Sequence, residues 1–148
     1  MSKVYNAILT IHSYWAYLVL LILFLATINA IVKFITNKPF TDKDLRISLF
    51  GLIVSHIQLL IGIVLYFVSP RFSQWSELGA GVMKNPLLRK VLLEHPLTNV
   101  IAIALITIGW SVHKKKTTAK AKFGKIAFFY MVGLLLFLLM IPYQLWFD

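Results

Sequence analysis

The chain has 148 residues, of which 59% are hydrophobic and 14% are charged, and it carries a formal net charge of +10. A soluble globular domain has about 25% charged residues, so this composition excludes an ordinary soluble protein. The absence of cysteine excludes disulfides, iron–sulfur clusters held by thiolates and the covalent attachment of c-type haem, but leaves non-covalent haem open.

Four long runs without charged residues follow one another along the chain. A membrane-spanning helix needs about 17–25 predominantly apolar residues, and the four runs meet this length, the third by a narrow margin. The runs predict helices at about residues 8–33, 45–69, 96–113 and 125–146. We therefore expect an all-α integral membrane protein, a four-helix bundle that forms a single transmembrane domain over residues 1–148. The first run is too long for a secretory signal and is interpreted as a retained helix.

Basic residues gather in two of the three connections. The connection 33–46 carries four lysines or arginines and the connection 113–125 carries six, whereas the rest of the chain carries five. By the positive-inside rule, we expect both basic loops in the cytoplasm and both termini outside, in a bacterial inner membrane. Residues 114–116 are then expected to contact anionic lipid head groups. Topology explains the net charge, so no nucleic-acid partner is expected.

Capping residues mark two helix starts in the connections. Thr41, with acidic residues in the turn that follows it, predicts the N-cap of the second helix. In the longest connection, Asn85 can cap a helix, Pro86 suits a first helical position, and apolar residues then recur at helical spacing. This pattern predicts a short interfacial helix at about 85–94, between the second and third spanning helices, which could cover the outer end of the bundle as a lid.

Small and polar residues form one stripe on each of two spanning helices. The stripe of the second helix consists of Gly51, Ser55, Gln58 and Gly62, and that of the third helix of His95, Asn99, Ala102, Ile106, Gly109 and His113. Small residues let helices approach closely in lipid, so we expect both stripes to face the bundle. The stripe of the second helix could also serve a homodimer interface.

Three histidines lie in these apolar runs or at their edges: His12, His56 and His95. Ionisable residues at membrane depth are costly and are therefore candidates for a functional site, and neutral imidazole is a common ligand of iron, copper and zinc. Helical rise places His12 and His95 at a similar depth near the outer face, and His56 about 18 Å inward from the outer end of its helix. His12 and His95 are the easiest pair for one metal, although a tilted helix would bring His56 into reach.

The neighbours of the histidines predict different environments. Glu94 could orient the imidazole of His95 as a hydrogen-bond partner, and Pro96 begins the third helix. His113 adjoins three lysines and is interpreted as a solvated residue at the membrane boundary.

Three motifs resemble one known family. They are His12-Ser13, the stretch from Ser55-His56-Ile57-Gln58 through Gly62 to Ser69-Pro70, and Glu94-His95-Pro96-Leu97. These motifs resemble small four-helix cytochrome b-like membrane proteins of Bacteroidota-type bacteria, and the resemblance covers nearly the whole chain. It implies haem b, held without covalent attachment by two of the three histidines as axial ligands, with the third free for a propionate or quinone contact.

The chain departs from this family in one respect. Family members tend to carry an arginine a few residues after the first histidine, whereas Tyr14 and Trp15 stand there in this chain. If that arginine pairs with a haem propionate, another cation must take its place. The candidates are Arg71, Arg89 and Lys84.

We therefore expect a membrane-embedded b-type haem protein that transfers electrons near the outer face, as a carrier or subunit rather than a stand-alone enzyme. The membrane location suggests a quinone as the exchange partner. A non-haem copper or zinc protein would use the same three histidines, with Met83 nearby, and would need them within about 4–5 Å of one another. An accessory or assembly subunit of a larger membrane complex would use the histidines only for hydrogen bonds between helices. The apolar runs contain no paired carboxylates and no nucleophile–base pair, so hydrolysis is not expected.

Overall fold

A computed structural model describes residues 2–146 of the chain. Four helices are long and apolar enough to cross a membrane, which confirms the expected all-α chain of four candidate spans. They are α1 (Ser2–Ile35), α2 (Asp42–Val68), the helix Pro86–Lys114 and α6 (Ala119–Leu139). The helix Pro86–Lys114 consists of α4 (Pro86–Arg89), the π-helical turn η3 (Lys90–Glu94) and α5 (His95–Lys114). Shorter segments are η1 (Pro70–Ser73), α3 (Gln74–Leu78), η2 (Gly79–Lys84) and α7 (Tyr143–Trp146).

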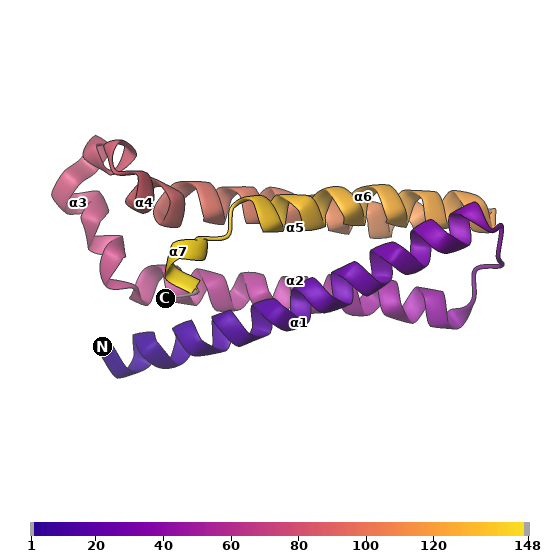
Figure 1. Ribbon diagram of the computed structural model, residues 1–148, viewed down its shortest axis with the longest axis horizontal. Helices are drawn as coiled ribbons and strands as arrows, with labels where there is room; N and C mark the ends of the chain where they lie inside the picture. Colours follow the sequence, from indigo (N-terminus) through magenta and orange to yellow (C-terminus); the bar gives the residue numbers. More distant parts are fainter. Residues whose placement is uncertain (1, 147–148) are drawn as a thin grey trace.

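The two loops rich in basic residues lie at one end of the bundle, and both chain ends lie near the other (Figure 1). We call these the basic end and the termini end. The connection 69–85, with η1, α3 and η2, extends beyond the termini end. In the bundle, α1 packs against α2 and α6, and α5 packs against α6 and α2. Both α1 and α5 contact α2 and α6, so α1 and α5 lie diagonally across the bundle from each other.

The core follows the helical period along each helix. Its buried members on α1 are Val19, Leu23, Ala26 and Ala30, and those on α6 are Phe123, Ile126, Tyr130, Leu134 and Phe137. Glycines allow α5 and α6 to approach closely, because a Cβ at Gly133 would lie 2.6 Å from Cγ1 of Ile106. A Cβ at Gly109 would lie 2.5 Å from Cβ of Phe129. Both spacings are too short for a Cβ, so each glycine lets a large side chain of the partner helix pack directly against its backbone.

The two predicted stripes face the bundle. Gly51 and Ser55 of α2 are buried, and so are Ala102, Ile106 and Gly109 of α5. The periodicity of small residues therefore identified the inward faces of these two helices correctly.

The prediction for His113 is wrong, because this side chain is only 1% exposed. His113 ends the inward stripe of α5, and its Nδ1–H donates to the carbonyl of Trp110. The ring of Phe40, from the loop between α1 and α2, covers it with the ring centres 5.5 Å apart. Phe40 also packs on Phe123, so the loop closes the basic end over the histidine.

Several helix boundaries differ from the predicted ones, and the first helix already begins at Ser2. The fourth spanning helix begins at Ala119, where Thr118 accepts a hydrogen bond from the N–H of Ala121, and it ends at Leu139 instead of continuing to residue 146. Pro142 accounts for the early end, because proline lacks an N–H and keeps the residue before it out of the helical conformation. The helix predicted at 85–94 does begin with Asn85 as its cap, but it continues without a break into α5.

A buried carboxylate joins α1 to α2 at the basic end. Asp44 is 1% exposed, and its Oδ1 accepts hydrogen bonds from Lys33 and from Asn29, the latter at 2.9 Å. Its Oδ2 accepts from the N–H of Thr41 at 2.8 Å and from the hydroxyl of Thr41 at 2.9 Å. The expected cap of α2 at Thr41 is therefore present, and the same carboxylate ties the cap to α1.

We expect Asp44→Asn to lower the free energy of unfolding by about 3–5 kcal/mol, because it leaves the Lys33 ammonium without its buried counter-charge. The measurement is SDS-induced unfolding in mixed micelles, followed by far-UV circular dichroism. Asp42→Asn is the matched control, since Asp42 is exposed in the same helical turn and its loss costs about 1 kcal/mol or less. Equal losses in the two variants would contradict a stabilising role for the buried pair.

Candidate functional site at the termini end

A proline and a π turn shape the start of α5. Pro96 has no N–H, so the carbonyl of Leu92 lacks its usual helical donor. The hydroxyl of Tyr66 on α2 donates to this carbonyl at 2.8 Å instead, and Nε1–H of Trp75 donates to the hydroxyl at 2.8 Å. The N–H of His95 bonds to the carbonyl of Lys90, five residues back, which defines the π turn. Such turns are frequent at functional sites, and this one ends at a candidate ligand.

Backbone and amide groups orient His95. Its Nδ1–H donates to the carbonyl of Met140, at the end of α6, over 3.0 Å. Nδ2 of Asn99 lies 3.3 Å from Nε2 of the same ring. The predicted orienting role of Glu94 is not borne out by these contacts, because the Glu94 carboxylate pairs with Nε of Arg89 at 3.3 Å. The partner of the imidazole is thus the free carbonyl at a helix end, a group that the sequence motif does not reveal.

His12 is held by α2. A Cβ at Gly62 would lie 3.4 Å from Cε1 of the His12 ring, so the glycine gives the imidazole its space. One turn away, Nε2–H of Gln58 donates to the backbone carbonyl of His12 at 2.8 Å. Nδ1 of His12 is buried and has no hydrogen-bond partner among residues 2–146.

His12 and His95 meet across the diagonal of the bundle, with their ring centres 6.2 Å apart and their planes at 86°. We call His12, Gln58, Gly62, His95 and Asn99 the histidine cluster. Within the described part of the chain, three buried polar atoms of this cluster lack a partner: Nδ1 of His12 and the two acceptors Oε1 of Gln58 and Oδ1 of Asn99. Unpaired buried polar atoms are costly, and a cluster of unpaired acceptors is suited to a metal ion or to a donor-rich ligand.

The spacing of the two imidazoles fits one metal ion between them. Two nitrogens that bind an ion from opposite sides, each about 2 Å from it, place the ring centres roughly 6 Å apart. With Nδ1–H of His95 donated to a carbonyl, its Nε2 carries the lone pair, and a ligand bond at Nε2 would replace the contact with Nδ2 of Asn99. The pair that depth analysis favoured is therefore the pair that the structure brings together.

His56 lies apart from this pair. It precedes Gly62 by six residues, which places it about 9 Å further along α2 and about 120° around the helix. The ring is exposed, with Nδ1 bound to the carbonyl of Leu52 at 2.8 Å and Nε2 at 3.4 Å from Oγ1 of Thr107 on α5. No group of three or more potential metal ligands is found in the described residues, so the three-histidine site of the copper or zinc alternative is not formed there.

The two arginines predicted to hold a propionate have different surroundings. Nη1–H of Arg71 donates to the hydroxyl of Tyr5 at 3.4 Å, at the termini end of α1. Tyr5 precedes His12 by seven residues, or about 10 Å along the helix. Arg89 is bound to Glu94 and to the carbonyl of Met83, so its guanidinium is already engaged. Arg71 is the better placed of the two.

Gln58 and Asn99 belong to the site although the sequence motifs did not assign them a role. Both were visible as members of the inward stripes, one helical turn from Gly62 and from His95. An amide side chain that lies on an inward stripe, at the same depth as a histidine, is the sequence feature that could have identified Gln58 and Asn99.

The neutral ring of His95 is expected to carry its proton on Nδ1, because the Met140 carbonyl can only accept a hydrogen bond. Nitrogen-15 NMR of the protein labelled at histidine measures this directly, and His95→Gln assigns the signal. Asn99→Leu should leave the tautomer unchanged, since the carbonyl remains. A ring protonated on Nε2 would show that the helix end does not hold the imidazole.

No protein-family model, curated protein or solved structure matches the chain. The resemblance to cytochrome b-like proteins therefore stays a prediction from the sequence motifs. The functional assignment depends on the geometry of the histidine cluster.

Proposed function

We propose that the protein is a membrane-embedded electron carrier in which His12 and His95 are the two axial ligands of a b-type haem. The observation that carries the proposal is the 6.2 Å separation of these rings, from helices on opposite sides of the bundle. Facing helices are the usual source of cofactor ligands in bundles. A bound haem would supply the one-electron redox chemistry.

The residues of the chain have defined tasks in this proposal. The Met140 carbonyl fixes the orientation of His95, and Gly62 and Gln58 fix that of His12. Holding both rings before the group binds reduces the entropy lost on binding. Both rings are half-buried in the bundle, and burial is one of the factors that set a haem potential.

The orientation and partners of the protein follow from the same proposal. The positive-inside rule assigns the basic end to the cytoplasm of a bacterial cell, so the histidine cluster lies toward the outer face of the inner membrane. We assign the exposed His56 to contact with a quinone, because it is the remaining histidine at membrane depth. A homodimer or larger membrane complex would bring the electron donor within reach.

An absorption spectrum tests the haem assignment. Protein produced with haem available and purified in mild detergent should show a Soret band and, after reduction, a sharp α-band. His12→Ala and His95→Ala should each abolish the low-spin spectrum, because each removes one axial ligand. His56→Ala is the matched control and should retain it.

Several outcomes would contradict this assignment. Colourless wild-type protein, or a low-spin spectrum that survives His95→Ala but is lost in His56→Ala, excludes the His12–His95 pair as haem ligands. Retention of one equivalent of copper or zinc, lost in both His12→Ala and His95→Ala, would replace the haem by a bare metal ion. Size-exclusion profiles and circular dichroism verify that each variant is folded.

A further inference from the structure

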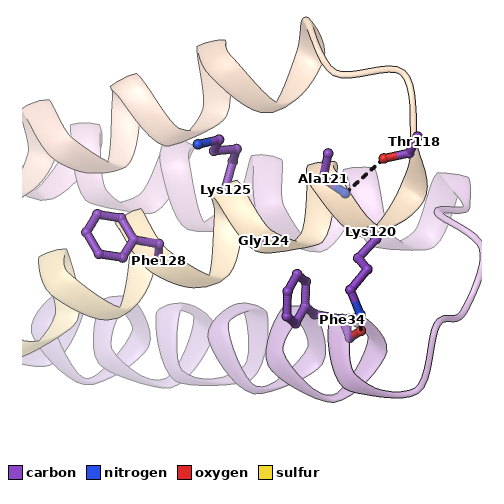
Figure 2. Close-up of a pocket in the computed structure, with 7 residues that line it drawn as sticks. All are labelled: Phe34, Thr118, Lys120, Ala121, Gly124, Lys125 and Phe128. Atoms are coloured by element: carbon purple, nitrogen blue, oxygen red, sulfur yellow. Dashed lines mark hydrogen bonds between the residues drawn. The ribbon is translucent and has the colours of Figure 1, made fainter.

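At the basic end, a groove of about 520 Å³ runs along α6 beside the end of α1. Its lining is apolar along the floor and basic at the rim (Figure 2). Phe34 of α1 and Phe128 of α6 supply the aromatic surface, and Lys120 and Lys125 supply the charge. This groove lies at the opposite end of the bundle from the histidine cluster and is independent of it.

Gly124 forms the floor of the groove. A Cβ at this position would lie 3.1 Å from Cε2 of Phe34, so the phenyl ring lies directly against the α6 backbone. Any larger residue would push Phe34 aside and fill the space between the two helices.

The two lysines differ in how they are held. Nζ of Lys120 donates to the carbonyl of Phe34 at 3.2 Å and to Oδ1 of Asn37 at 3.1 Å, and it lies 4.3 Å from the centre of the Phe34 ring. Lys125 lines the groove at the edge opposite to Lys120 (Figure 2), and it has no ion pair or hydrogen bond within residues 2–146. No acidic residue lines the groove, and Lys33 is the single basic residue of this end that forms an ion pair in the described part of the chain.

Depth restricts the chemistry of a ligand. Lys125 lies six residues into α6, or about 9 Å along the helix, and Phe128 lies almost one turn deeper. A lysine at this level extends its ammonium toward the head-group region and leaves its methylenes against apolar surface. A ligand for the groove must therefore combine an anion at the rim with hydrocarbon along the floor.

We propose that this groove binds an anionic phospholipid, with its phosphate at Lys120 and Lys125 and its upper acyl chain against Phe34 and Phe128. A free inorganic anion would satisfy the lysines but leave the aromatic floor uncovered. A zwitterionic lipid would bring its own ammonium next to the two lysines, which is repulsive. An anionic lipid complements both the charge and the apolar surface.

A thermal-shift titration of the purified protein in uncharged detergent tests the proposal, with phosphatidylglycerol, phosphatidylcholine and inorganic phosphate as probes. Phosphatidylglycerol should raise the unfolding midpoint in a saturable manner, as expected for a ligand of the folded state. Lys125→Gln should weaken its apparent affinity by about tenfold, because a charged hydrogen bond to phosphate is lost. Gly124→Leu should weaken it by a similar factor without any change of charge.

Lys115→Gln is the control at the same end, since Lys115 is exposed outside the groove and carries the same charge. It should weaken binding less than about threefold, the effect expected of general attraction to the surface. Lys125→Arg should restore the affinity. The proposal is overturned if phosphatidylcholine or inorganic phosphate shifts the midpoint as much as phosphatidylglycerol, or if Lys125→Gln and Lys115→Gln behave alike.

Discussion

The bundle depends on one constraint, which is that polar groups between apolar helices must find partners inside the chain. Backbone carbonyls provide most of them, because a carbonyl already bonded within a helix has a second lone pair. Trp15 donates in this way to Val54, Tyr130 to Ser48 and Gln58 to His12, over 2.9, 2.6 and 2.8 Å. Two of these bonds join α2 to its neighbour α1, and the bond of Tyr130 joins α2 to α6 across the bundle. Trp15 and Tyr130 combine one donor with a large apolar body, so they fix the register of the helices while adding to their packing.

The same constraint explains how a proline leads to a site. Pro96 leaves one carbonyl without its helical donor, and the hydroxyl of Tyr66 bonds to it from α2. The π turn accommodates an additional residue just before His95, which turns the inward face of α5 relative to α4. His95 then lies on the same face as Asn99 and points across the bundle toward His12. The cluster is therefore built from a local defect in helix geometry that a neighbouring helix stabilises.

The sequence was sufficient for the four spans, for the inward faces of α2 and α5, and for pairing His12 with His95 by depth. It was insufficient where a partner comes from a distant segment. The three lysines that follow His113 predict a solvated side chain, yet Phe40 reaches it from another loop. Glu94 was adjacent to His95 in the chain, but a carbonyl 45 residues away is the actual acceptor. Helical periodicity indicates which face of a helix points inward. It does not indicate which group of a distant segment packs against that face.

The position at which α6 ends restricts the number of residues that this helix can have. The last carbonyls of a helix lack helical donors, and that of Met140 is used by His95. The number of residues from the cap at Thr118 to Met140 therefore determines where the Met140 carbonyl lies relative to the basic end. Gaining or losing one residue there would move the acceptor by about 1.5 Å and 100°, away from the imidazole. Over most of its length, the connection 69–85 is not held to a fixed number of residues in this way. Insertions during evolution should therefore accumulate there and not in α6.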